Sequence, residues 1–211
     1  MKNGIIFILE GRRGYNVMRN LAFYKYSDVL SKLKTDGEKI SWIEGRINQV
    51  LIHPLEELRK VWQENKEIQC LNLGIMTLLC SGIEALSNFY LQIEDSGKRF
   101  KKFVENYMNA EFRMKDPSGK KYSSYLWDDF RCGLAHGFSI EKGGILEETN
   151  RYIRFDDKKG LGIDLWLFFE DFKHAVATFM NDVRKASKNS MLRNNFLARF
   201  DKLFGNSKKK G

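Results

Sequence analysis

The chain has 211 residues, of which 43% are hydrophobic and 30% are charged, and only 2 are proline. This composition is typical of a folded globular protein rich in helix, and it excludes collagen-like, mucin-like and wholly disordered chains. The 3 cysteines form no CxxC pair, so they support neither a disulfide framework nor a zinc knuckle and favour a reducing, cytoplasmic location.

The net charge of +9 is concentrated at the C-terminal end. Basic residues outnumber acids nine to one after residue 183, while the preceding part of the chain is close to neutral. Attraction to nucleic acid or to an anionic surface is therefore expected to act through this segment. The candidate nucleic-acid-binding residues are Arg193, Arg199, Lys202, Lys208, Lys209 and Lys210.

The first 37 residues are expected to form an extension that packs on the core, with a short strand at 5–9 and a helix at 17–33. The five apolar residues of that strand are too few for the core of a signal peptide. The next helix starts near Ser41 and is expected to kink or restart at Pro54, because proline lacks the amide hydrogen and crowds the preceding turn.

The stretch 68–93 is apolar nearly all round, which predicts the central helix of a bundle, enclosed by the other helices. Its longest uncharged run has 16 residues, short of the roughly 20 that span a bilayer, so integral membrane association is not expected. Glu84 is the only acid in the stretch. A buried carboxylate needs a compensating cation, so we expect an arginine partner; the alternative is that Glu84 reaches the surface at the helix edge.

The predicted fold class is mainly α: a single-domain helical bundle over 38–188 with a small β-hairpin insertion at about 143–164. A basic amphipathic helix and tail follow at 189–211. The periodicity predicts the later elements in this order: a helix around 100–107, a turn at 116–119, a helix from about 123 to a cap at Gly137, the hairpin or small meander, a helix over 168–183 and a final helix over 191–204.

The common enzyme signatures are absent: there is no P-loop, GxGxxG, HExxH, GxSxG or EF-hand spacing. One alternative is a metal enzyme built around Glu170, Asp171 and His174, whose spacing presents ligands on one helix face. Such a small set arises often by accident, so no metal and no cofactor are expected.

The segment Phe130–Gly137, with the sequence FRCGLAHG, separates Arg131 from His136 by four residues near the end of a helix. It resembles the R-x4–6-H motif of the HEPN superfamily, all-helical domains found in many metal-independent ribonucleases and in toxin and antiphage systems. The resemblance covers about residues 68–183. It implies a HEPN-like homodimer of a stress or antiphage system that cleaves or binds RNA, with an antitoxin or another protein as a further partner.

RNA carries its own nucleophile, the 2′-OH, so cleavage needs only a base, a cation for the phosphorane and a proton donor for the leaving oxygen. The resemblance gives the acid or base role to His136 and phosphate binding to Arg131. One arginine and one histidine are too few for the whole task, and in the family two motifs commonly meet across a dimer interface.

Four further residues are candidates for supporting this site. Glu84 is the expected partner of an arginine. Cys132 stands where the family often has a polar residue, and Asp128, one turn earlier, is a candidate replacement for that polar group unless it is simply solvated. Gly133 interrupts the helix interior, which is expected to let a partner helix or a phosphate approach the backbone; tight packing within the monomer is the alternative.

Two alternatives to catalysis stay open. In the first, Arg131 neutralises Glu84 in the core and His136 caps the helix. In the second, the protein is a non-catalytic dimeric interaction module, and the segment 191–204 docks on a partner protein or an anionic surface.

Overall fold

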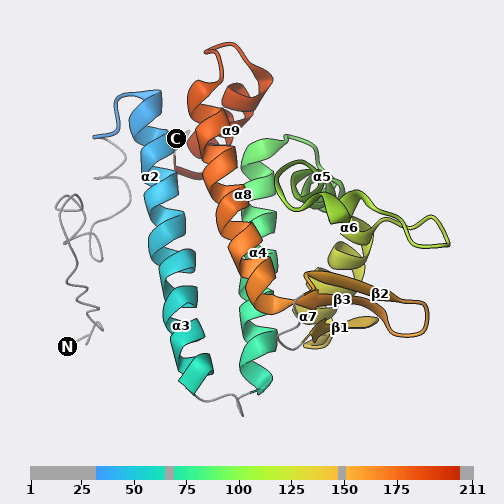
Figure 1. Cartoon of the computed structure of the whole chain (residues 1–211). Helices are drawn as coiled ribbons and strands as arrows, with labels where there is room; N and C mark the ends of the chain where they lie inside the picture. Colours follow the sequence, from blue (N-terminus) through green and yellow to red (C-terminus); the bar gives the residue numbers. More distant parts are fainter. Residues whose placement is uncertain (1–31, 65–68, 147–150, 205–211) are drawn as a thin grey trace, which may run out of the picture.

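Two long helices, α4 (Gln69–Tyr90) and α8 (Leu165–Lys185), contact each other at the centre of the protein (Figure 1). The computed structural model describes residues 32–64, 69–146 and 151–204. This part of the chain is mainly helical with one small sheet, so the predicted fold class of a mainly α single domain is confirmed. The strand expected at 5–9 and nearly all of the helix expected at 17–33 lie outside the described residues.

A long helical rod packs against α8 and starts at a capping box (Figure 1). The Thr35 hydroxyl accepts from the Glu38 amide at 3.2 Å, and the Glu38 carboxylate accepts from the Thr35 amide at 2.8 Å. The rod consists of α2 (Asp36–Ile47), the π-helical turn η1 (Asn48–Ile52) and α3 (His53–Glu64). The interruption expected at Pro54 is this π turn, which places the proline in the first turn of α3, where its missing amide hydrogen costs little.

The core between the helices is largely aromatic. Burying each phenylalanine is worth about 1.5–3 kcal/mol of transfer free energy. Most of the fully buried phenylalanines come from α5 (Ser96–Tyr107), the 3-10 turn η2 (Ala110–Arg113), α8 and α9 (Met191–Phe204): Phe100, Phe103, Phe112, Phe168, Phe169, Phe172, Phe179 and Phe196. The apolar side of the basic helix α9 is therefore largely part of this core: Phe196 and Phe200 are buried, while Met191 and Leu203 near its ends are exposed.

Within the described residues, helix α4 is enclosed on one side only, which corrects the expectation of a helix wrapped all round. Leu78 is 44% exposed, and Gly74, Ser81 and Ala85 are exposed on the same face, because residues spaced by three, four and seven positions align along a helix. This exposed face of α4 carries no charge at these positions.

Residues Leu71–Tyr90 of α4 are long and apolar enough, by length and composition alone, to cross a membrane. Half of that stretch is buried within the bundle. The central helix of a globular protein passes the same test, so the single helix is weak evidence for a membrane span.

The helix expected from about residue 123 to Gly137 is present, but nearly half of it is π-helical. It consists of α6 (Tyr122–Tyr125), the π-helix η3 (Leu126–Cys132) and α7 (Gly133–Gly137). A π-helix holds more residues per turn than an α-helix, so η3 rotates the residues that follow it relative to those before it. The segment packs on α4 and α5, with Leu126 and Phe130 fully buried.

The expected hairpin is present within a three-stranded sheet at one end of the bundle (Figure 1). Its strands are β1 (Gly143–Leu146), β2 (Ile153–Asp156) and β3 (Gly160–Asp164). β2 and β3 pair antiparallel, as predicted, whereas β1 adds in parallel to the other edge of β3. Asp164 ends β3 and caps α8 by accepting from the amides of Trp166 and Leu167, which fixes the sheet to the central helix.

Candidate functional site

Arg131 lies in η3 and forms an ion pair with Glu84 of α4. Its Nε and Nη2 donate to the same Glu84 oxygen, Oε2, at 2.9 and 2.7 Å. The two side chains are 22% and 24% exposed, so the pair sits at the edge of the core with one side open to solvent. The expected arginine partner of Glu84 is thereby confirmed, and it is the arginine of the candidate motif.

The guanidinium of Arg131 is also held from one side by an indole ring. It lies 5.0 Å from the ring centre of Trp127, a cation–π distance. Trp127 packs in turn on Phe100 and against Gly97, where a Cβ would lie 2.8 Å from the indole nitrogen. The absence of a side chain at Gly97 therefore makes room for the ring that orients Arg131.

Two cysteines lie close enough to this pair to affect its electrostatics. Cys80, on α4, is fully buried, and burial raises the pKa of its thiol to about 12 in spite of the nearby Arg131. Cys132, the residue that takes the place of the family's polar group, is half-buried. The Cys80 thiol is therefore protonated at neutral pH and is not a nucleophile.

Asp128 does not support Arg131, which corrects that expectation. Its side chain is exposed and forms an ion pair with Lys120 at 2.9 Å, as the solvated alternative implied. The neighbouring Asp129 is the buried acid: it is 6% exposed, Oδ2 has no hydrogen-bond partner among the described residues, and burial raises the pKa of its carboxyl group. Its position three residues after the core residue Leu126 is the sequence feature that indicates burial.

Gly133 is buried because the chain itself returns along the helix. The Ser139 amide donates to the Gly133 carbonyl at 3.3 Å, and the Glu141 amide donates to the Asp129 carbonyl at 3.2 Å. A Cβ on Gly133 would lie 2.4 Å from the Ser139 carbonyl oxygen. The close approach expected of a partner helix or a phosphate is thus made by residues 139–141 of the same chain.

His136 is exposed in the last turn of α7. Within the part of the chain that the structure describes, its imidazole has no hydrogen-bond or ion-pair partner, so it does not cap the helix through its side chain. The cap expected at Gly137 falls one residue later. Phe138 adopts the left-handed conformation, with φ of 53°, and the residue is 87% exposed. This backbone conformation is unusual for an aromatic residue and leaves the ring in solvent close to His136 in the chain.

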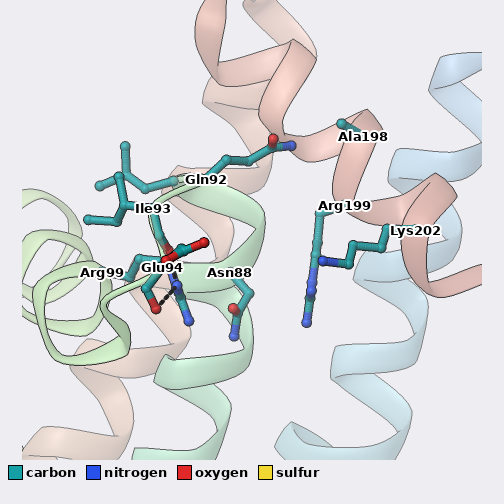
Figure 2. Close-up of a pocket in the computed structure, with 9 residues that line it drawn as sticks. Asn88, Gln92, Ile93, Glu94, Arg99, Ala198, Arg199 and Lys202 are labelled. Atoms are coloured by element: carbon teal, nitrogen blue, oxygen red, sulfur yellow. Dashed lines mark hydrogen bonds between the residues drawn. The ribbon is translucent and has the colours of Figure 1, made fainter.

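The basic residues of the C-terminal segment have different surroundings. Arg193 donates to Asp36 at 3.2 Å and to the Ala186 carbonyl at 3.2 Å, so it ties α9 to α2, contrary to the nucleic-acid contact expected of it. Arg199 and Lys202 line a pocket (Figure 2). Residues 208–210 lie outside the described part.

Two of the three side chains considered as metal ligands, Glu170 and Asp171, have other partners. Glu170 pairs with Arg59 at 2.7 Å, and Asp171 accepts from the Tyr152 hydroxyl at 2.6 Å and from the Asn109 amide at 2.9 Å. Among residues 32–64, 69–146 and 151–204, no group of three histidine, cysteine or acidic side chains is placed to hold a metal ion.

The structure therefore brings together Glu84, Arg131 and Cys132, places His136 exposed farther along the same helical segment, and separates Asp128 from them. Sequence reasoning missed Trp127 and the segment 139–141. In comparisons with known proteins, no family model, no curated protein and no solved structure matches this chain.

Proposed function

We propose that the protein is a HEPN-like, metal-independent endoribonuclease that acts as a homodimer, with Arg131 and His136 as its working pair. The observation that carries the proposal is the state of these two side chains. Arg131 is fixed at the surface by Glu84 and Trp127, and His136 stands exposed and unpartnered among the described residues. An oriented guanidinium and a free imidazole near the end of one helical segment match the chemistry of RNA cleavage.

In the proposed reaction the imidazole of His136 takes the proton of an RNA 2′-OH or gives one to the leaving oxygen. The 2′ oxygen attacks the adjacent phosphorus, the bond from phosphorus to the 5′ oxygen breaks, and the 5′ oxygen leaves with a proton. The products are a 2′,3′-cyclic phosphate and a 5′-OH. The Nη1 group of Arg131, which is not bonded to Glu84, would donate to the phosphate as its charge grows.

A second copy of the chain would supply the second histidine and arginine that the reaction needs. The exposed face of α4 supports this: Leu78, Ser81 and Ala85 form an uncharged strip directly beside Glu84. Charged residues are depleted at the centres of protein interfaces, and small side chains allow two helices to approach closely. Two copies paired through this face would bring their Arg131 side chains to the same interface.

The test is incubation of the purified protein with a mixed RNA pool in EDTA, followed by analysis of the product ends. We compare the wild type with Arg131→Lys, His136→Ala and the control His174→Ala, which removes an exposed histidine from α8. Lysine keeps a cation beside Glu84 but loses the planar set of donors. We expect cyclic phosphate ends from the wild type and the control, and a loss of about 10²–10⁴-fold for His136→Ala. No cleavage by a folded wild type, or equal cleavage by all variants, would contradict the proposal.

The second candidate function is a non-catalytic dimeric interaction module. It is favoured by one observation: two nitrogens of Arg131 are already bonded to Glu84, as the structural alternative requires. Sedimentation of the wild type and of Ala85→Arg separates the outcomes. A dimer that dissociates in this variant and shows no cleavage would support the module. A monomeric wild type would exclude both dimeric functions.

A further inference from the structure

A pocket of about 460 Å³ lies at the end of α4 distant from the sheet. Its walls are the last turn of α4, the loop from α4 to α5, and α9 (Figure 2). The lining is formed by Asn88, Leu91, Gln92, Ile93, Glu94, Arg99, Ala198, Arg199 and Lys202. This volume is within the range of sites that bind small molecules.

The pocket contains more positive than negative groups. Of the described residues that line it, three are basic, Arg99, Arg199 and Lys202, and one is acidic, Glu94. Arg199 and Lys202 are three residues apart on α9, so they lie on neighbouring turns of one face, where like charges repel each other. Among the described residues, neither has an ion-pair or hydrogen-bond partner. Two adjacent cations that have no ion-pair partner among the described residues are stabilised when an anion binds between or beside them.

The Arg199 side chain also contains a buried hydrogen-bond donor that has no acceptor among the described residues. Its Nε is shielded from solvent and has no acceptor within the described part of the chain. Figure 2 shows the side chain extending from α9 along the side of α4, next to Lys202 and at the level of Asn88. A buried donor without an acceptor costs free energy, which a ligand oxygen at this position would recover.

The opposite wall is held in place by Arg99. Its Nη1 donates to the Ile93 carbonyl and, at 2.9 Å, to the Glu94 carbonyl, so the guanidinium fixes the loop between α4 and α5. Gln92 bridges to α9 by donating to the Asn195 carbonyl at 3.2 Å. The pocket is thus tied across its walls by hydrogen bonds, which favours a preformed site.

We propose that this pocket binds a phosphate group, with Arg199 and Lys202 as the groups that bind it. Proteins commonly bind phosphate oxygens with the guanidinium group of arginine and the ammonium group of lysine. The phosphate comes either from a free nucleotide or from an RNA strand. The second source rests on the proposed function: Asn88 lies one helical turn, about 6 Å, along α4 from Glu84, so one strand could contact both Arg131 and the pocket.

The experiment measures binding by calorimetry to the full-length protein at fixed salt, with AMP and with a 12-nucleotide oligouridylate as the two probes. The variant Arg199→Gln/Lys202→Gln is compared with Lys158→Gln/Lys159→Gln, which removes the same two charges at the turn between β2 and β3, far from α9 (Figure 1). Circular dichroism verifies that both variants fold.

We expect the pocket variant to weaken binding of at least one probe by about tenfold or more, since each lost hydrogen bond to a charged group is worth at least that factor. The control should change binding by less than about twofold, as expected for a distant charge. Binding of AMP identifies a nucleotide site, and binding of the oligonucleotide alone identifies a strand site. Equal weakening in both variants, or no binding of either probe to the wild type, overturns the inference. Because binding is measured without cleavage, AMP binding stands even if the nuclease test fails.

Discussion

The replacement of Gly133 by alanine tests the packing that surrounds the candidate site. The new Cβ would lie 2.4 Å from the Ser139 carbonyl oxygen and 3.3 Å from the Glu141 amide nitrogen, both of which are backbone atoms. To reach an ordinary contact, residues 139–141 must retreat by about 1 Å in a closely packed region. That movement strains or breaks two backbone hydrogen bonds, each worth about 1 kcal/mol.

Alanine also has a higher helix propensity than glycine, which raises the free energy of unfolding by about 1 kcal/mol and offsets part of this loss. With overpacking costs of about 1–3 kcal/mol and about 2 kcal/mol for the two hydrogen bonds, less the gain in helix propensity, we expect Gly133→Ala to lower the free energy of unfolding by about 2–4 kcal/mol. Each kcal/mol corresponds to a fall in Tm of about 2–4 °C for a chain of this length.

The assay is urea unfolding followed by circular dichroism, with Gly74→Ala as the matched control. Gly74 is an exposed helical glycine, and a Cβ added there would meet no neighbouring atom within 4 Å, so alanine should stabilise the protein by about 0.5–1 kcal/mol. If Gly133→Ala unfolds at the same urea concentration as the wild type, or at a higher one, residues 139–141 do not return along the helix as closely as these distances require.

Three further outcomes are expected. Asp129→Asn should be more stable than the wild type at neutral pH. This gain should shrink as the pH falls through the raised pKa of Asp129, because the wild-type carboxyl group then becomes neutral in the folded state. A difference in stability that does not change with pH in urea titrations would contradict this. Thr35→Ala should cost about 1 kcal/mol by removing the cap of α2, while Thr35→Ser should cost little, as measured by thermal unfolding. Cys80 should resist iodoacetamide in the folded protein and react after unfolding, whereas Cys132 should react before Cys80, as peptide mass spectrometry would show.

Apolar periodicity predicted the helices and the mainly α fold, because each helix buries one stripe of side chains. The pairing of Glu84 with an arginine was also predictable, since a carboxylate in an apolar helix needs a counter-charge. The exposed face of α4 was not predicted: Gly74, Ser81 and Ala85 are small and uncharged, so sequence alone does not separate an exposed position from a tightly packed one.

Long-range contacts limited the prediction of the site. The role of Gly133 depends on residues 139–141, and the position of Trp127 depends on Gly97 in another helix. The partner of Arg193 is more than 150 residues away in sequence, at Asp36. Local patterns report which face of an element is apolar, but they do not report which distant segment lies against it.

The π-helix η3 left one trace in the sequence. The apolar residues Tyr122, Leu126, Phe130 and Leu134 recur strictly every four positions. In an α-helix each such step drifts by about 40°, so the two steps from Leu126 to Leu134 would carry the stripe through about 80° and toward the edge of the core. The last three of these side chains are nonetheless all at most 3% exposed. A constant spacing of four accords with the wider turn of η3.

The wider winding of η3 determines how far the side chains of α7 are rotated about the helix axis relative to those of α6. Deleting one residue between Leu126 and Phe130 while the remaining residues of η3 kept their wider winding would rotate everything downstream by the angle of one residue, somewhat less than the about 100° of an α-helix. Arg131 would then turn away from Glu84, and Gly133 would no longer face residues 139–141. The winding of η3 thus decides which side chains the segment presents at the surface, while the hydrophobic stripe anchors the segment to the core. A single insertion or deletion here would reorient the candidate site and leave the sequence of the motif unchanged.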